Sequence, residues 1–198
     1  HTLFYEVLAE IEALMKRLQG LTDRRAIGKR IFGEKDDAQD EKRKKNGQYA
    51  GAISPLAVSV SLRPGSKEEI LEQLLELLSV SGQLDPVHKQ SALDDLLERE
   101  RTMSTGMQEG IALPHAKTPA TDRLVSAAGL VRDGVDFDSL DGKPSRIFIL
   151  TLAPKDAHEP YLEYMAEVSR MLMNHEHREK ILGADNDQRL YETLTRQL

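Results

Sequence analysis

The sequence predicts an α/β domain in which helices cover a central sheet. Short apolar stretches alternate with polar residues as strands do, longer stretches have helical periodicity, and the two kinds interleave along the chain. The 198 residues suffice for one domain of ordinary size and an appendage. We interpret residues 52–198 as the domain and residues 1–51 as an amphipathic helix followed by a charged linker.

The first elements of the domain have clear boundaries in the sequence. Residues 56–62 alternate apolar and small polar side chains, which predicts a strand. Ser66 can cap a helix and Glu69 follows three residues later, so the pair predicts a capping box. The helix that begins there has an apolar stripe and is expected to end near Gly82.

The remaining elements follow from the same patterns. Asp85 and Pro86 begin a second helix, whose buried face is expected to include Val87 and Leu93. Further strands are predicted at 111–113, 124–131 and 146–153, a third helical stripe from Leu162 to Leu172, and two short helices around 175–182 and 187–197.

The amino-terminal appendage has two distinct parts. Residues 3–18 have the spacing of an amphipathic helix, which either packs on the domain or on a second copy, or follows a membrane domain that is missing. Residues 35–46 contain a single apolar residue, an alanine, and predict a solvated linker. Its basic cluster at 42–45 leaves contact with anionic lipids open. Because the chain starts with His1, we interpret it as part of a longer protein.

Composition excludes several classes of function. The net charge is -6, and the acidic excess lies after residue 50, which argues against nucleic acid as the partner. There is no cysteine, so disulfides, thiol nucleophiles and thiolate metal sites are excluded. The longest apolar runs are far shorter than the roughly 20 residues that a membrane-spanning helix needs.

One histidine stands at an unusual place. In the stretch GIALPH, His115 follows Pro114 at the point where the predicted strand 111–113 should end. Proline fixes its own φ and favours extended geometry for the preceding residue, so the direction of the next side chain is restricted. Ligands of α/β proteins commonly bind at strand ends. A packed residue, a metal ligand, a base and a nucleophile all remain open for His115.

The residues before this strand favour an anion site. Arg99 and Arg101 offer forked donors, Ser104 and Thr105 offer hydroxyls, and Gly106 offers a backbone N–H. Such a set suits an oxyanion like phosphate. An anion pocket beside a histidine indicates phosphoryl transfer or phosphate recognition.

Residues 99–118, RERTMSTGMQEGIALPHAKT, resemble the signature of the enzyme IIA domains of the bacterial sugar phosphotransferase system. The similarity is to the fructose–mannitol branch, which includes the nitrogen-regulatory enzyme IIA proteins. Residues 66–78, 134–154 and 161–172 follow in the family's order and spacing, so the resemblance covers roughly residues 52–198. It implies a mixed central sheet with helices on both faces.

The resemblance also implies roles for individual residues. His115 matches the phosphorylated histidine, which accepts a phosphoryl group from the carrier protein HPr and yields it to an enzyme IIB. A neutral imidazole suits this role at pH 7. Arg99 matches the arginine that neutralises phosphoryl charge, and Ser104 and Thr105 match the loop hydroxyls, with Gly106 beside them. Neither a metal nor an organic cofactor is implied.

One position departs from the family pattern. A second histidine usually begins the helix beside the phosphorylated one, and the aligned residue here is Tyr161. Either the Tyr161 hydroxyl replaces that histidine, or His158 reaches in from the loop, or transfer is impaired. We favour Tyr161, because Pro160 is expected to prevent helical spacing between His158 and Tyr161.

Two functions follow as hypotheses. The first is a phosphoryl carrier domain, a phosphotransferase component that serves an enzyme IIB or uses its phosphate as a regulatory signal. The alternative is a regulatory enzyme IIA-like domain fused to a membrane transporter, with impaired or no sugar-coupled transfer. We expect a cytoplasmic location, with a tether at the inner face of the membrane left open. Whether the chain forms a homodimer also stays open.

Overall fold

The computed structural model describes residues 51–196 and 198. The elements in chain order are β1 (Ile53–Ser59), α3 (Lys67–Val80), the short 3-10 helix η1 (Pro86–His88), α4 (Lys89–Thr102), β2 (Ile111–Ala112), β3 (His115–Lys117), β4 (Val125–Val135), β5 (Ser145–Ala153), α5 (Glu159–Met173), α6 (His175–Leu182) and α7 (Asp187–Thr195). The amphipathic helix expected at 3–18, the linker at 35–46 and the membrane tether lie outside these residues. Among the helices that the structure does describe, none has the length and apolar character to cross a bilayer.

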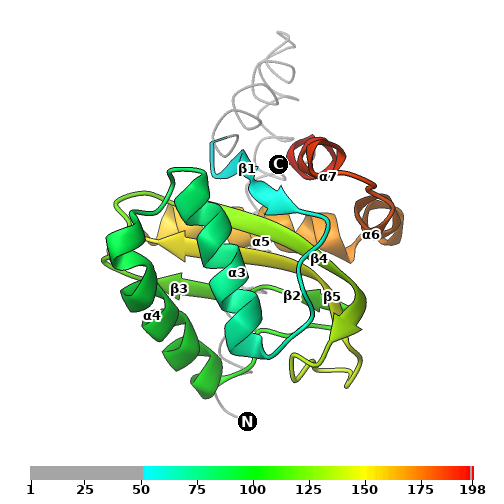
Figure 1. Cartoon of the computed structure of the whole chain (residues 1–198), viewed down its shortest axis with the longest axis horizontal. Helices are drawn as coiled ribbons and strands as arrows, with labels where there is room; N and C mark the ends of the chain where they lie inside the picture. Colours follow the sequence, from blue (N-terminus) through cyan, green and yellow to red (C-terminus); the bar gives the residue numbers. More distant parts are fainter. Residues whose placement is uncertain (1–50, 197) are drawn as a thin grey trace, which may run out of the picture. The chain divides into compact units, whose positions relative to one another are not determined.

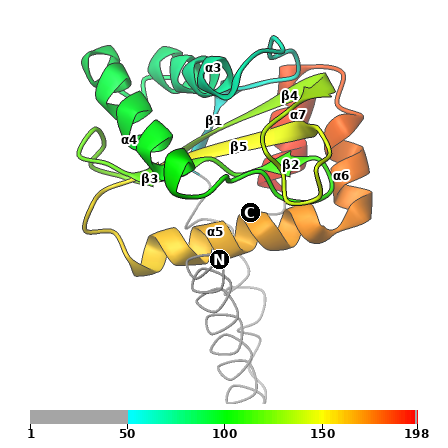
Figure 2. The same ribbon diagram turned by 90° about the horizontal axis from the view of Figure 1, so that it is seen from below.

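The strands form one mixed sheet. Its order is β1-β4-β5-β2, and β3 also pairs with β5. Strands β2 and β3 run parallel to β5, and β1 runs parallel to β4, whereas β4 and β5 are antiparallel. Helices α3 and α4 cover one face and α5 covers the other (Figures 1 and 2). The expected mixed sheet with helices on both faces is confirmed.

The core consists of two apolar clusters, one on each face of the sheet. Strand β5 contributes to both because successive side chains point to opposite faces. Phe148 and Leu150 pack in the cluster with α3 and α4, and Ile147 and Ile149 pack in the cluster with α5, α6 and α7. Because β5 is buried on both faces, it appears in the sequence as a continuous apolar run.

Sequence patterns predicted the ends of most helices and strands well. The capping box is present: the Ser66 hydroxyl accepts from the Glu69 N–H, and the Glu69 carboxylate accepts from the Ser66 N–H. Strand β1 begins three residues earlier than expected and includes Pro55. A proline is tolerated there because, among the strands that the structure describes, β1 lies at the edge and pairs with β4, so the missing N–H need not break a ladder.

Two apolar residues lie outside the core against expectation. Val87 is 77% exposed because the chain forms η1 at that point and α4 begins only at Lys89. Leu162 is 38% exposed in the first turns of α5, whereas Val168 on the same helix is fully buried. Tyr161, beside Leu162, is only 8% exposed, so Leu162 lies at the margin of the buried face of α5, which helical periodicity did not distinguish from its centre.

Candidate functional site

His115 lies at the beginning of a strand rather than at its end. The chain pairs with β5 at Ile111 and Ala112, leaves the ladder for two residues, and pairs again from His115 in the same register. At the break, the Pro114 carbonyl accepts a hydrogen bond from the Thr151 N–H at 2.9 Å. The predicted strand thus ends at Ala112, within one residue of the expected end. The chain does not pass into a loop beyond Pro114, however, because β3 begins at His115 and pairs with the same strand.

The His115 ring has a defined orientation. Its Nδ1 lies 2.8 Å from the Leu113 carbonyl oxygen, and because a carbonyl only accepts, Nδ1 carries the proton. In the neutral ring, Nε2 then keeps its lone pair. Burial lowers the pKa of His115 to about 4, and the positive charge of Arg99 acts in the same direction. The imidazole is therefore neutral at pH 7, with Nε2 as a nucleophilic nitrogen.

Arg99 and Tyr161 act on this ring from two different helices. Arg99 lies in the last turn of α4, where its guanidinium donates to the Met103 carbonyl at 3.0 Å. Its positive charge lowers the pKa of both His115 and Tyr161. The Tyr161 ring lies 6.1 Å from the His115 ring, centroid to centroid. Helix α4, strand β3 and the amino end of α5 lie on one side of the domain (Figure 2).

Tyr161 is a neutral hydrogen-bond donor at physiological pH. Its side chain is buried, and burial raises the pKa of its hydroxyl above the ordinary value, although the charge of Arg99 partly opposes this. A neutral phenol keeps its O–H and can donate to an anion.

His158 occupies the N-cap position of the helix that carries Tyr161, but its side chain makes no capping hydrogen bond. Helix α5 begins at Glu159, and Pro160 occupies its first turn, where a missing N–H costs nothing. The expectation that Pro160 prevents helical spacing between His158 and Tyr161 was therefore wrong. The Nδ1 of exposed His158 lies 3.1 Å from the Nζ of Lys117.

The loop hydroxyls expected to bind phosphate hold the loop itself in this structure. The Ser104 hydroxyl donates to the Phe137 carbonyl at 2.6 Å and accepts from the Gly106 N–H at 3.1 Å. Both the hydroxyl and the N–H of Thr105 donate to the carboxylate of Glu100. A role of Ser104, Thr105 and Gly106 in phosphate binding stays a prediction, and it requires these groups to release their present partners.

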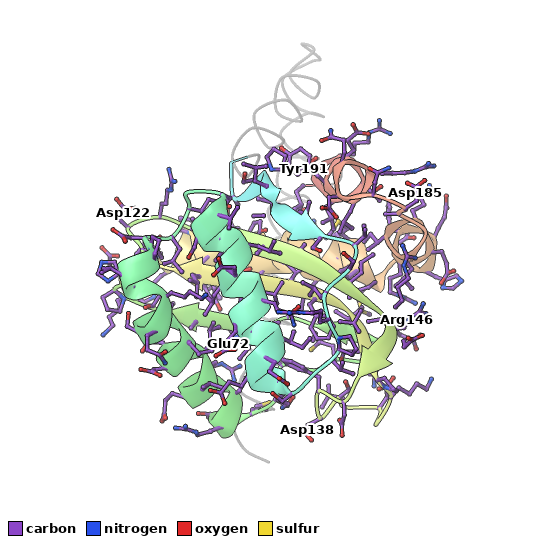
Figure 3. All side chains as sticks on the ribbon, viewed as in Figure 1. Glu72, Asp122, Asp138, Arg146, Asp185 and Tyr191 are labelled. Carbon is purple, nitrogen blue, oxygen red and sulfur yellow. The ribbon has the colours of Figure 1, made fainter. Side chains whose placement is uncertain are left out.

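Gly106 in the same loop has no room for a side chain. A Cβ on Gly106 would lie 2.6 Å from the Phe137 carbonyl oxygen, closer than two such atoms can approach. Phe137 belongs to the segment between β4 and β5, which also carries Asp138 (labelled in Figure 3). Asp138 forms a 2.8 Å ion pair with Lys67, and Lys67 also lies 3.3 Å from Glu100. The beginning of α3 is thus tied to the end of α4.

This loop in turn positions His115. The Thr105 carbonyl accepts from the Leu113 N–H at 3.0 Å, and the Leu113 carbonyl accepts from His115. Glu100 therefore acts on the orientation of the imidazole through two backbone groups.

Lys117 is a site residue that the sequence analysis missed. It lies two residues after His115 in β3, so the two side chains project from the same face of the strand. Its Nζ lies 5.6 Å from the centre of the Tyr161 ring, a cation–π distance. The period of two along a strand is the signal that would have found it, had 115–117 been expected to be a strand.

The site concentrates cations and donors around a neutral nucleophile. Arg99 and Lys117 bring positive charge, and Tyr161 brings a neutral hydroxyl. Within 51–196 and 198, no three His, Asp or Glu side chains gather into a group that could hold a metal ion. The arrangement is suited to receiving an anionic group on Nε2 of His115.

The pKa of His115 gives a testable stability profile. The unfolded chain takes up a proton on this histidine near pH 6.5, but the folded chain does so only near pH 4. Between these values the unfolded state binds more protons, so the free energy of unfolding falls as pH falls, by up to about 3 kcal/mol in total. Denaturant unfolding from pH 7.5 to 4.5 should show a shallower fall for His115→Gln. Identical profiles would contradict a ring whose pKa is lowered in the folded domain.

The domain has a neutral histidine, an arginine and a lysine at one edge of its mixed sheet. Such a site is typical of proteins that bind or transfer anionic groups. The family model described as "Phosphoenolpyruvate-dependent sugar phosphotransferase system, EIIA 2" matches residues 53–197. The chain belongs to this family, as its sequence signature predicted.

Curated relatives include a sugar-specific protein and nitrogen regulatory proteins. A PTS system fructose-specific EIIA component from Haloferax volcanii is 38% identical over 143 residues, which cover 72% of this chain and 92% of the relative. A nitrogen regulatory protein from Pseudomonas aeruginosa is 32% identical over 140 residues, which cover 71% of this chain and 90% of the relative.

Solved structures share the fold. The nitrogen regulatory protein IIA-Ntr from Neisseria meningitidis superimposes with a TM-score of 0.67 at 23% identity, over 73% of this chain and 97% of that one. Enzyme IIA mannitol of Escherichia coli, solved in complex with phosphorylated enzyme IIB mannitol, gives a TM-score of 0.59 at 18% identity, over 71% of this chain and 95% of that one.

Proposed function

We propose that this EIIA domain carries a phosphoryl group on Nε2 of His115. The observation that carries the proposal is the hydrogen bond from Nδ1 to the Leu113 carbonyl, which leaves Nε2 unprotonated on a neutral ring. In the forward step, an N–P bond forms at Nε2 while the N–P bond to the histidine of phosphorylated HPr breaks. In the second step, Nε2 is the leaving group as the phosphoryl group passes to the acceptor.

The charges around His115 support this step. The phosphoryl group carries negative charge throughout the transfer, and the guanidinium of Arg99 is positioned to stabilise it. Tyr161 can donate its hydroxyl to a phosphoryl oxygen, and we assign to it the place of the family's second histidine. Ser104, Thr105 and Gly106 would join only after the loop rearranges.

The partners follow from the same proposal. HPr is the donor, and an enzyme IIB is the acceptor, as in the mannitol enzyme IIA that was solved with phosphorylated enzyme IIB. We place the domain in the cytoplasm, with a tether to the membrane through residues 1–50 as a further hypothesis. A homodimer stays a prediction.

The regulatory alternative has one observation in its favour. Tyr161 stands where a histidine is usual, and a nitrogen regulatory protein is among the relatives. Such a role does not require loss of phosphorylation, since the phosphorylated state can itself be the signal. A transporter-fused domain without transfer is less well supported, because the site keeps its neutral histidine and its arginine.

Incubation with enzyme I, HPr and labelled phosphoenolpyruvate tests the proposal. We expect incorporation of a single phosphoryl group, lost in acid and kept in alkali as an N–P bond is, with the label mapped to His115 by mass spectrometry. Addition of an enzyme IIB should then remove the label. No incorporation, under conditions that label a fructose-specific enzyme IIA, would overturn the proposal.

Tyr161→Phe tests whether the hydroxyl takes part in transfer. Phenylalanine keeps the buried ring but removes one donor to the phosphoryl group, so we expect the transfer rate from HPr to fall roughly fivefold to tenfold. Rapid-quench kinetics measure this rate. Tyr191→Phe on α7 is the matched control and should transfer at the wild-type rate.

The converse result has a clear meaning. If Tyr161→Phe transfers normally while His158→Ala is slow, His158 and not Tyr161 supplies the group that replaces the usual histidine.

A further inference from the structure

Lys117 stands in a position from which it can reach a group on His115. Residues 115–117 alternate in burial, so Ala116 points into the cluster beneath α3 and α4 while His115 and Lys117 are half-buried on the opposite face. Two residues along a strand span about 6.6 Å. The four-carbon stem of a lysine is long enough to bring Nζ over that distance.

In the unphosphorylated domain the ammonium has other partners. Lys117 Nζ lies 3.1 Å from His158 Nδ1 and 5.6 Å from the centre of the Tyr161 ring. An ammonium has only donors, so His158 Nδ1 is the acceptor in this contact. The contact with His158 is exposed to solvent, and such a bond is weak enough to exchange.

Charge favours an exchange after phosphorylation. A phosphoryl group adds about 1.5 to 2 negative charges at pH 7. Arg99 supplies one positive charge, and its guanidinium is also committed to the Met103 carbonyl. A flexible ammonium on the same face of β3 can neutralise the remainder, and the oxygens of a phosphoryl group are far stronger acceptors for it than an exposed imidazole nitrogen.

We propose that Lys117 is a second phosphoryl-binding residue, held by His158 and Tyr161 in the free domain and transferred to the phosphoryl oxygens when His115 is phosphorylated. The inference rests on the proposed function of His115. It gives His158 a role of its own, which is to hold the lysine next to the site without touching the reacting atoms.

This inference is tested by measuring the equilibrium constant for transfer of the phosphoryl group from HPr to the domain. Lys117→Gln removes a contact that is stronger in the phosphorylated state, so the equilibrium constant should move roughly fivefold or more toward phosphorylated HPr. Lys117→Arg keeps the cation and should recover most of the loss. Lys89→Gln, at the opposite end of α4 from Arg99, is the control and should match the wild type.

His158→Ala should move the equilibrium in the opposite direction. The His158 contact exists only in the free domain, so its loss favours phosphorylation by about twofold to tenfold. A purely structural role of the pair predicts instead that both variants lower phosphorylation. Thermal unfolding of each variant checks that the fold is kept.

The outcomes separate the two proposals. A wild-type domain that takes no phosphate overturns the function of His115 and this inference with it. A wild-type domain that is phosphorylated overturns the inference alone if Lys117→Gln stays within twofold of it, or if His158→Ala falls as Lys117→Gln does.

Discussion

The His115→Ala variant is expected to accept no measurable phosphoryl group from HPr while keeping its fold. The imidazole provides the only atom to which the phosphoryl group bonds in the proposed step, and the removal of a nucleophile lowers rates by about a thousandfold or more. The backbone of His115 would still pair with β5. Labelling from phosphoenolpyruvate through enzyme I and HPr measures the loss, and circular dichroism checks the fold.

The control for this variant is another histidine of the same domain. His88 is exposed at the end of η1, and His88→Ala should be labelled like the wild type. Label retained in His115→Ala, at any other histidine, would contradict the assignment. Label lost in both variants would show that the assay reports the state of the fold and not the nucleophile.

His115 illustrates how much of a site local sequence can reveal. The Gly-Ile-Ala-Leu-Pro-His stretch predicted a rigidly presented ring, and the structure shows that rigidity in the bond from Nδ1 to Leu113, two residues away. The capping box at Ser66 and the apolar run of β5 were readable for the same reason. Each of these signals depends on residues close together in the chain.

The contacts that sequence patterns could not supply are long-range. Ser104 has the composition of an anion-loop residue, yet its hydroxyl donates to the Phe137 carbonyl, 33 residues later. Likewise Lys117 meets His158 across 41 residues. The hydrogen-bond partner of such a hydroxyl or ammonium depends on where β4, β5 and α5 lie in the folded domain. Amino-acid composition alone does not predict this.

Pro114 and Pro160 show the limit of a local rule. Pro114 was expected to mark the end of a strand, and Pro160 was expected to prevent helical spacing between His158 and Tyr161. Strand β2 does end at Ala112, but β3 begins at His115, and α5 begins at Glu159. Pro114 interrupts a strand whose neighbours on either side still pair with β5, and Pro160 occupies a helix turn whose N–H groups need no partner. Proline lacks a backbone N–H. Whether it ends a strand or a helix therefore depends on whether the N–H at that position would have made a hydrogen bond.

The positive charge of Arg99 acts on several groups of the site. Its guanidinium lies at the carboxyl end of α4, is half-buried, and is oriented by the Met103 carbonyl. Its charge acts on both His115 and Tyr161. A fixed cation in a partly desolvated site stabilises developing charge more strongly than one in water, because little reorganisation is needed.

The Arg99→Ala variant is therefore expected to slow transfer from HPr by about a hundredfold or more. Arg99→Lys should recover only part of the rate, because an ammonium keeps the charge but lacks the planar fork. Arg101→Ala is the matched control. Arg101 was expected beside Arg99 among the anion donors, but its side chain is 74% exposed and paired with Glu98. Rapid-quench measurement of kcat/KM compares the three variants with the wild type.

The pH profile distinguishes the charge of Arg99 from a structural effect. Arg99 lowers the pKa of His115, so its removal raises that pKa, and the acid limb of the rate profile should move from near pH 4 to higher pH. A variant that is only poorly folded would lose rate at every pH without moving the limb. Suppose that the Arg99→Ala domain transfers as fast as Arg101→Ala and that its acid limb does not move. Other groups would then neutralise the phosphoryl charge, and Lys117 would be the next candidate.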